Sequence, residues 1–229
     1  MLEDIIRSEK LHKYYEGEVR VHALRGVDIS IKKGEMVAIM GPSGCGKTTL
    51  LNSLSGLDDI SSGKVWIGDQ DLNELSDNQK TEMRALSMGF IFQFYNLLPV
   101  LSAVENVELP LLLAGKTKDA RKKAEKALDL VGLSHRYDHR PSALSGGERQ
   151  RVTIARAIVN EPDIIWADEP TGDLDTETSD KIMDILCKLN KKNGHTMILV
   201  THEDRVAERA DRILHMESGL IERDQNNGA

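Results

Sequence analysis

Three mostly apolar runs along the chain predict buried strands. They cover residues 36–40, 163–167 and 196–201. A strand covered on both faces shows continuous apolar residues instead of an alternation, as in the parallel sheets of α/β proteins. The first run leads into Gly41, and the second into Asp168 and Glu169. These runs therefore predict the centre of a parallel sheet with polar chemistry at its ends.

Helical spacing marks two further segments. The first apolar stripe, which ends before Gly194, is formed by Ile182, Ile185, Leu186 and Leu189. The second, which ends before Gly132, is formed by Ala120, Ala124, Ala127, Leu128 and Val131. The basic face opposite the second stripe, which we interpret as solvent-exposed, carries Arg121, Lys122, Lys123 and Lys126. Recurrence at i, i+3, i+4 and i+7 is typical of amphipathic helices. Strand–helix alternation at both ends with a helical middle predicts an α/β fold with an inserted helical lobe.

Composition limits the function classes. The chain has 229 residues, 29% of them charged, and a net charge of −7, which is typical of a globular protein and argues against a nucleic-acid partner. The most apolar stretch, residues 96–115, is interrupted by Pro99, Glu105 and Pro110, so no membrane span is expected. Only two cysteines are present, Cys45 and Cys187, and the start of the chain lacks a secretory signal. We therefore expect a cytoplasmic protein.

A phosphate-binding loop follows the first strand. Residues 41–48 read GPSGCGKT and match the pattern G-x-x-x-x-G-K-[ST] between a buried strand and an apolar helix. Backbone N–H groups of such a loop turn toward phosphate oxygens, and the helix N-terminus adds partial positive charge. Lys47 is predicted to reach the β- and γ-phosphates, and the hydroxyl of Thr48 to bind Mg²⁺. The predicted nucleotide-binding residues of this loop are Gly41, Ser43, Gly44, Cys45, Gly46, Lys47, Thr48 and Thr49.

A second motif indicates the family. GTPases usually read guanine with N-K-x-D, and residues 190–193 read NKKN without the aspartate. Residues 144–151 read LSGGERQR, and here the chain resembles the ABC ATPases. The resemblance implies that Ser145, Gly146 and Gly147 bind the γ-phosphate of ATP held by a second copy. It therefore implies a homodimer with two shared ATP sites.

The same resemblance implies a fold and its division. The expected fold is a P-loop NTPase of RecA-like type, with a parallel-sheet core, an N-terminal antiparallel β part and an inserted helical lobe. The whole chain, 1–229, would form one ABC ATPase domain. Its nucleotide-binding core would comprise residues 1–93 and 157–223, and its helical lobe residues 94–156. Residues 224–229 are expected to be a frayed tail.

Further residues match the family's catalytic positions. Asp168 would hold Mg²⁺ through water, and Glu169 would be the base that polarises the attacking water. Gln93 would reach the metal and this water, and His202 would contact the γ-phosphate. Asp175 would lie in a loop that faces the other subunit. Each of these assignments is implied by the resemblance.

Base recognition leaves two alternatives. Tyr14 is the first candidate for stacking on adenine, and the adjacent Tyr15 could replace it. Because an aromatic ring stacks on any base, GTP use stays open.

Three segments resemble a subgroup of the family, the macrolide-exporter and lipoprotein-release type. They are residues 89–99, 105–110 and 167–175. Members pair with a permease that has few spanning helices and a large extracytoplasmic domain, so the chain is expected on the inner face of the membrane. Export, extraction and mechanotransmission all fit this partner. The residues that depart from the subgroup pattern are Glu148, Arg149, Trp166 and Glu203.

Other functions remain as alternatives. A similar permease could serve envelope sensing or cell division without transporting anything. A soluble non-transport ABC ATPase would normally carry a long coiled coil between its motifs or two ATPase domains. The presence of Glu169 and His202 argues against a nucleotide-dependent switch with negligible ATP turnover.

Overall fold

The chain folds into two compact units. The computed structural model describes residues 3–227. One unit contains the described residues up to Lys80 together with those from Gly194 onward, and the other contains Thr81–Asn193. Helix α2 (Asp77–Ser87) runs along the chain from the first unit into the second. Each unit is described by itself.

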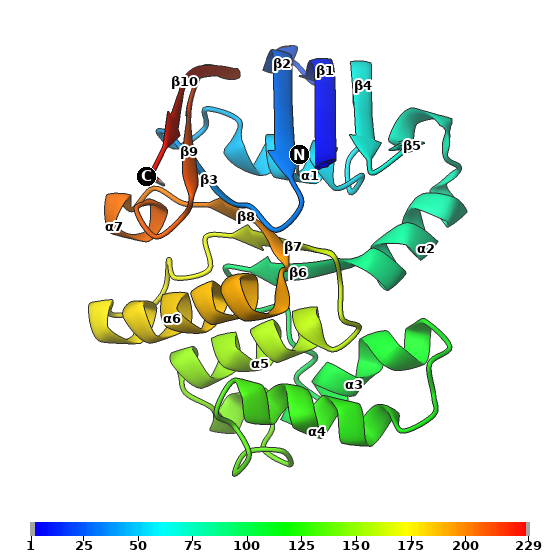
Figure 1. The fold of residues 1–229 in the computed structure, drawn as a ribbon, viewed down its shortest axis with the longest axis vertical. Coiled ribbons are helices and arrows are strands. Elements are labelled where there is room, and N and C mark those ends of the chain that lie inside the picture. The colour runs from blue at the N-terminus through cyan, green and yellow to red at the C-terminus, as the bar shows by residue number, and fades with distance from the viewer. Residues whose placement is uncertain (1–2, 228–229) are drawn as a thin grey trace. The chain divides into compact units, whose positions relative to one another are not determined.

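The first unit contains an antiparallel sheet in the order β2-β1-β4-β5. Its members are β1 (Asp4–Tyr15), β2 (Val21–Lys32), β4 (Ser62–Ile67) and β5 (Gln70–Asp71). In Figure 1 the strands β2, β1 and β4 lie side by side. Buried side chains such as Leu24, Val27 and Ile29 are spaced at two or three residues, because bulges interrupt the β1–β2 register. This sheet confirms the expected antiparallel part.

The same unit contains strands in the order β10-β9-β3-β8. They are β3 (Met36–Met40), β8 (Thr196–Val200), β9 (Arg212–Glu217) and β10 (Leu220–Asn226). Strand β3 is buried along its full length and pairs in parallel with both β8 and β9. The apolar runs therefore predicted β3 and β8 correctly. Helices α1 (Lys47–Leu54) and α7 (Asp204–Ala207) follow β3 and β8 along the chain.

The second unit combines two parallel strands with four α-helices. The strands are β6 (Met88–Phe92) and β7 (Ile164–Asp168), and the helices are α3 (Ala103–Leu113), α4 (Ala120–Leu130), α5 (Gly146–Ile158) and α6 (Thr176–Asn193). Helices α3, α4 and α5 pack against one another, as Figure 1 shows. The predicted stripes lie on the buried faces of α4 and α6, except that Ile185 is only half-buried. Of the predicted basic face, Lys122, Lys123 and Lys126 lie exposed on α4, whereas Arg121 is half-buried.

The predicted frayed tail is wrong as far as Asn226. Residues 224–226 belong to β10, which pairs with β9. Arg212 holds this pairing, because its guanidinium donates to both oxygens of Asp224 at 2.7 and 2.6 Å and to the carbonyl of Ser30 at 2.9 Å. The sequence alone gave no sign of this ion pair across strands. Residues 228–229 lie outside the described part of the chain.

The division into units differs from the predicted division. The second unit contains the whole predicted lobe, 94–156, and also β6, β7 and α6, which we had assigned to the core. The predicted boundaries of core and lobe stay a prediction. Within residues 3–227, no helix is both long and apolar enough to cross a membrane.

Candidate functional site

The phosphate-binding loop connects β3 to α1 and is packed too tightly for side chains at two glycines. A Cβ atom on Gly41, which has φ of 151°, would lie 2.0 Å from the carbonyl oxygen of Met216. A Cβ atom on Gly46, with φ of 108°, would lie 2.7 Å from the carbonyl oxygen of Ala23. Both residues must therefore be glycine for the loop to rest on strands β9 and β2. The side chain of Cys45 is buried, so this loop residue can offer a ligand only its backbone.

The start of α1 is prepared for an anion. Gly46 is its N-cap, so no side chain satisfies the first N–H groups, and no acidic residue lies in the first turn. The ammonium of Lys47 donates to the carbonyls of Gly41 and Pro42 at 2.8 and 3.0 Å. Thr48 is exposed beside it. The loop thus places a cation, a hydroxyl and a helix N-terminus close together, an arrangement that suits a phosphate group.

The second unit collects polar groups at the carboxyl ends of β6 and β7. Phe92 and Asp168 are paired across the two parallel strands, so Gln93 and Glu169 follow them at the same edge. Asp168 and Gln93 are half-buried. The Gln93 side-chain N–H approaches the carboxylate of Asp173 at 3.4 Å. The structure therefore brings together three predicted catalytic or metal-binding residues.

Glu169 has an unusual backbone. Its φ of 47° lies in the left-handed region, which costs a residue with a side chain about 1–2 kcal/mol. The carbonyl of Glu169 accepts a hydrogen bond from the N–H of Gly172 at 3.2 Å, which closes the turn after β7. Strain of this kind concentrates at functional sites. It aims Glu169 in a direction that an extended continuation of β7 would not give.

The signature segment forms the N-terminus of α5. Ser145 is the N-cap of a complete capping box: its Oγ accepts from the N–H of Glu148 at 3.2 Å, and Glu148 accepts from the N–H of Ser145 at 2.8 Å. Because Ser145 Oγ is an acceptor here, its own proton is available to an external ligand. A Cβ atom on Gly147 would lie 2.5 Å from Thr178 Cγ2, so α6 packs closely on this helix end.

One hydrogen bond connects the signature helix with the turn after β7, and Asp175 forms two more at the start of α6. The side-chain N–H of Gln150 donates to the carbonyl of Pro170 at 2.8 Å. Asp175 caps the following helix, accepting from the N–H and the hydroxyl of Thr178 at 3.0 and 2.6 Å. These hydrogen bonds from Thr178 lower the pKa of Asp175. Asp175 therefore has a structural role within its own chain beside the predicted one.

Tyr14 has both ring faces covered. Its ring stacks on His22 with centroids 4.0 Å apart and planes 14° apart. The Arg20 guanidinium carbon lies 4.1 Å from the same centroid, and two planar groups this close cannot share one face, so Arg20 covers the other. Tyr15 is engaged elsewhere, since its hydroxyl donates to Asp58 at 2.6 Å. A base that stacks on Tyr14 must displace either His22 or Arg20, and the Arg20 side chain is 61% exposed.

His202 lies in the first unit, exposed in the bend after β8. The next residue, Glu203, donates its N–H to the hydroxyl of Thr201 at 3.1 Å, which turns the chain at this point. Among residues 3–227 no group of three or more His, Cys, Asp and Glu side chains could hold a metal ion. The predicted oxygen donors for Mg²⁺, Thr48 and Gln93 with Asp168, suit an ion that keeps water and phosphate ligands.

Sequence reasoning missed one residue that contacts the signature segment from outside it. Arg136 donates to Glu148 at 2.8 Å and holds the capping box from outside. The spacing Ser-x-x-Glu was the available sign of the box, but nothing in the sequence indicated the arginine.

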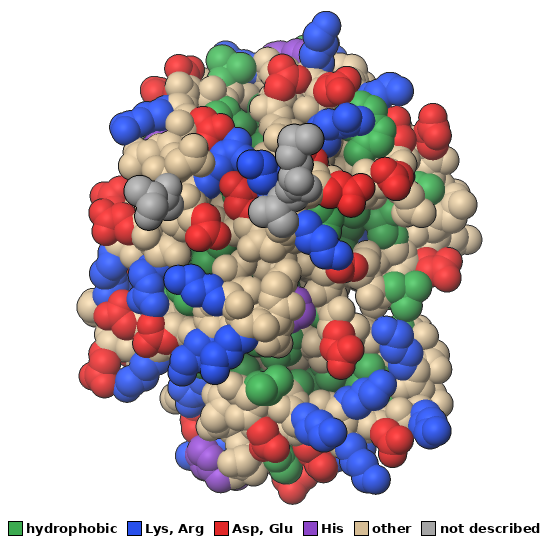
Figure 2. All heavy atoms as spheres, viewed as in Figure 1, with side chains coloured by type: hydrophobic (Ala, Val, Ile, Leu, Met, Phe, Trp, Pro, Cys, Tyr) green, Lys and Arg blue, Asp and Glu red, His purple; other side chains and the backbone are tan. Residues whose placement is uncertain are grey.

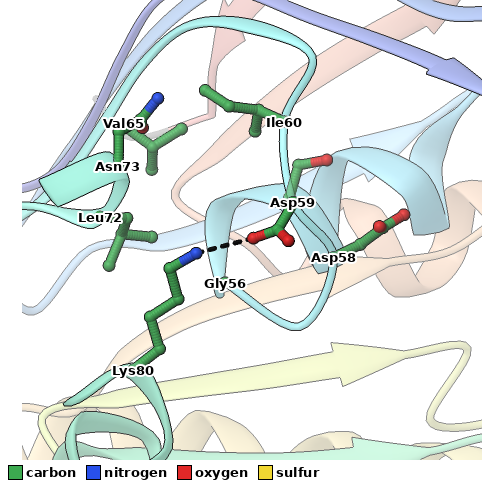
Figure 3. A pocket seen from close by; sticks show the side chains of 9 residues that line it. Gly56, Asp58, Asp59, Ile60, Val65, Leu72, Asn73 and Lys80 are labelled. Atoms are coloured by element: carbon green, nitrogen blue, oxygen red, sulfur yellow. Dashed lines mark hydrogen bonds and ion pairs between the residues drawn. The ribbon is translucent and has the colours of Figure 1, made fainter. Parts of the chain in front are cut away.

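A cavity of about 170 Å³ in the first unit lies apart from the phosphate-binding loop. Lys80 reaches across it to Asp59 at 2.7 Å, as Figure 3 shows. None of the predicted nucleotide-binding residues is among those that line it. On the face drawn in Figure 2, basic and acidic side chains are interspersed.

Comparisons with known proteins agree on one family. The family described as ABC transporter matches residues 24–172. The lipoprotein-releasing system ATP-binding protein LolD of Legionella pneumophila (strain Paris) is 49% identical over 219 residues, which cover 95% of this chain and 96% of that protein. LolD of Coxiella burnetii (strain RSA 493 / Nine Mile phase I) is 46% identical, with 95% of each chain covered. A solved dimer of the ATP-binding cassette MJ0796, in a post-hydrolysis state with ADP and Pi, has a TM-score of 0.91 and 42% identity, covering 98% of this chain and 99% of that one.

Proposed function

Since this chain belongs to the ABC transporter family, we propose that it is the ATP-hydrolysing subunit of a lipoprotein-releasing complex. It works as a dimer and drives a separate membrane permease. The identity to LolD proteins along almost the whole chain supports this substrate class.

One observation carries the dimeric mechanism. The chain has two helix N-termini prepared for phosphate, α1 after Gly46 and α5 after Ser145. One bound nucleotide needs the first of them only, so in the proposal the second serves the nucleotide of another copy. Ser145, Gly146 and Gly147 then contact the γ-phosphate bound by the partner, which makes ATP the bridge between subunits.

Nucleotide binding begins at the phosphate-binding loop. Lys47 leaves its carbonyl partners for the β- and γ-phosphates, and the first N–H groups of α1 bind phosphate oxygens. The base replaces Arg20 on the ring of Tyr14; Tyr15 is the second choice because its hydroxyl is already bound to Asp58. Aromatic stacking contributes about 1–3 kcal/mol per base.

Hydrolysis uses the polar edge of the second unit. Glu169 orients and polarises the water that attacks the γ-phosphate in line, and Gln93 positions the same water. His202 donates to the γ-phosphate. Thr48, Gln93 and, through water, Asp168 would hold Mg²⁺, which offsets the charge that develops on the phosphate oxygens. Their hydroxyl, amide and carboxylate oxygens fit the preference of this ion.

The finer assignments complete the proposal. The permease carries a large extracytoplasmic domain, and the chain lies on the cytoplasmic face of the membrane through it. Asp175 lies at the contact between subunits. The rival functions with the same chemistry are an envelope-sensing or cell-division complex and a soluble ABC ATPase.

Capture from native membranes tests the proposal. Glu169→Gln is expected to bind ATP, to lose turnover and so to hold its complex together, because the amide cannot act as base. Tagged Glu169→Gln is purified with ATP and Mg²⁺, and the proteins that accompany it are identified. Lys47→Ala, which loses the phosphate cation, is the matched control.

Each outcome selects a function. The expected result is that Glu169→Gln captures a permease with a large extracytoplasmic domain together with a lipoprotein. The wild-type chain, which hydrolyses ATP, is expected to lose this lipoprotein. The same permease without any lipoprotein would move the assignment to envelope sensing or cell division. Soluble companions alone would overturn the transport role, and normal turnover by Glu169→Gln would overturn the assigned base.

A further inference from the structure

The carboxylate of Glu148 lies in the first turn of α5, and the proposed function places a phosphate at the N-terminus of this helix. Glu148 is the third residue of α5, whose N-terminus includes Ser145, Gly146 and Gly147. A negative charge at a helix N-terminus stabilises the helix, but it repels a second anion that approaches the same N–H groups. A signature segment with glutamate therefore needs a means to cancel this charge.

Arg136 supplies the opposite charge. Its Nε donates to Glu148 Oε1 at 2.8 Å, while the other oxygen, Oε2, accepts the N–H of Ser145. The Glu148 side chain is 14% exposed and that of Arg136 34%, so the pair is partly shielded from water. His139 holds the guanidinium from the other side, because its Nε2 accepts from Arg136 Nη1 at 3.1 Å.

The neighbouring arginine does not serve this purpose. Arg149 directs its guanidinium to the carbonyl of Leu144 at 2.8 Å and lies over the ring of Tyr95. The first N–H groups of a helix have no acceptor within the helix. The N–H groups of Ser145 and Glu148 are bonded in the capping box, so those of Gly146 and Gly147 are left for a ligand.

We propose that Arg136 is a positioning residue of the signature segment, which cancels the charge of Glu148 and holds the capping box so that Gly146 and Gly147 bind the terminal phosphate of the partner's nucleotide. The inference rests on the nucleotide-bridged dimer of the proposed function. It assigns a role to a residue outside the signature motif and explains how that motif tolerates a glutamate.

The test measures dimerisation in a background that does not hydrolyse ATP. The dimer dissociation constant of Glu169→Gln with ATP and Mg²⁺ is determined by analytical ultracentrifugation at about 50 and 500 mM NaCl, concentrations between which Debye screening differs strongly. Arg136→Gln, added to this parent, is expected to raise the constant about tenfold at low salt, a magnitude found for close charge pairs at interfaces. High salt is expected to remove only part of the increase, because the Glu148 side chain is 14% exposed and a partly buried charge is screened less than an exposed one.

A double-mutant cycle separates charge from structure. With Glu148→Gln also present, Arg136→Gln is expected to change the dimer constant less than about twofold, because no carboxylate remains to be cancelled. Arg136→Lys keeps the charge and is expected to stay within about threefold of the parent. Arg121→Gln, which removes a half-buried arginine paired with Glu108, Glu125 and Asp138, is the matched control and is expected to leave the dimer constant unchanged.

The outcomes are distinct. An equal effect of Arg136→Gln with and without Glu148→Gln, or an effect of Arg136→Lys as large as that of Arg136→Gln, would overturn the charge role. Should Arg136→Gln fail to fold, Arg136→Met, which keeps the length of the side chain without its charge, replaces it in the same cycle with Glu148→Gln. A parent that stays monomeric with ATP would instead refute the nucleotide-bridged dimer and the inference with it.

Discussion

Replacing Glu169 by glycine is expected to leave the chain more stable than replacing it by alanine. The φ of 47° puts this residue in the left-handed region. A side chain there costs about 1–2 kcal/mol, which glycine avoids, while glycine loses about 0.5–1 kcal/mol more chain entropy on folding. The balance favours Glu169→Gly over Glu169→Ala by about 1 kcal/mol. Both variants lose the proposed base, so turnover does not distinguish them.

Urea unfolding of the two variants measures this difference. Trp166, fully buried three residues before Glu169, provides a local fluorescence probe. The matched control is the same pair of substitutions at Lys188, an exposed residue inside α6. In a helix, glycine is less stable than alanine by about 1 kcal/mol, so the order of the two variants is expected to reverse.

The reversal between the two sites is the decisive result. It amounts to about 2 kcal/mol in unfolding free energy, or roughly 4–8 °C in melting temperature for a chain of this length. Alanine equal to or better than glycine at position 169 would show that Glu169 is not strained. The argument that strain aims the carboxylate out of the strand direction would then be wrong.

Two further predictions follow from the loop and from the signature helix. Gly41→Ala is expected to abolish ATP binding, because its Cβ would lie 2.0 Å from the carbonyl oxygen of Met216. Gly44→Ala has open space around it and is expected to cost only about 1–2 kcal/mol of unfolding free energy. Equal ATP affinities of the two variants in titration calorimetry would contradict this prediction. The N–H of Ser145, helped by Arg136, lowers the pKa of Glu148 from 4.5 to about 2. A lowered carboxyl pKa stabilises the fold above pH 4.5, and this stabilisation is lost as the pH falls toward 2. Glu148→Gln is therefore expected to lower the unfolding free energy by about 1 kcal/mol above pH 4.5, after allowance for solvent screening, and by less as the pH falls. A difference in urea unfolding that does not change with pH would refute this prediction.

The sequence alone determined the central strands and the chemistry at their ends. Continuous apolar runs predicted β3, β7 and β8 to within a residue, because a strand buried on both faces has no place for polar side chains. Spacing of apolar residues likewise predicted α4 and α6. The glycine-rich loop was predictable since its glycines and Lys47 are adjacent in sequence, and phosphate binding needs only that local order.

Contacts between distant segments were decided by the tertiary structure. Arg212 and Asp224 join β9 to β10, and β10 extends to Asn226, into the residues expected to form a frayed tail. The close approach of Thr178 to Gly147 and the pairing of Arg136 with Glu148 depend on how helices of the second unit pack. No periodicity predicts such pairs, because their separation along the chain follows from packing.

The choice between Tyr14 and Tyr15 is one that the sequence alone could not make. The two tyrosines are adjacent in β1 and have the same side chain, so the sequence could favour one of them only through the family resemblance. In a strand, adjacent side chains point to opposite faces, which sends one ring to His22 and Arg20 and the other to Asp58. A site formed by adjacent residues, such as the phosphate-binding loop, could therefore be predicted from the sequence. The contacts of each tyrosine side chain were determined by strand pairing in the sheet.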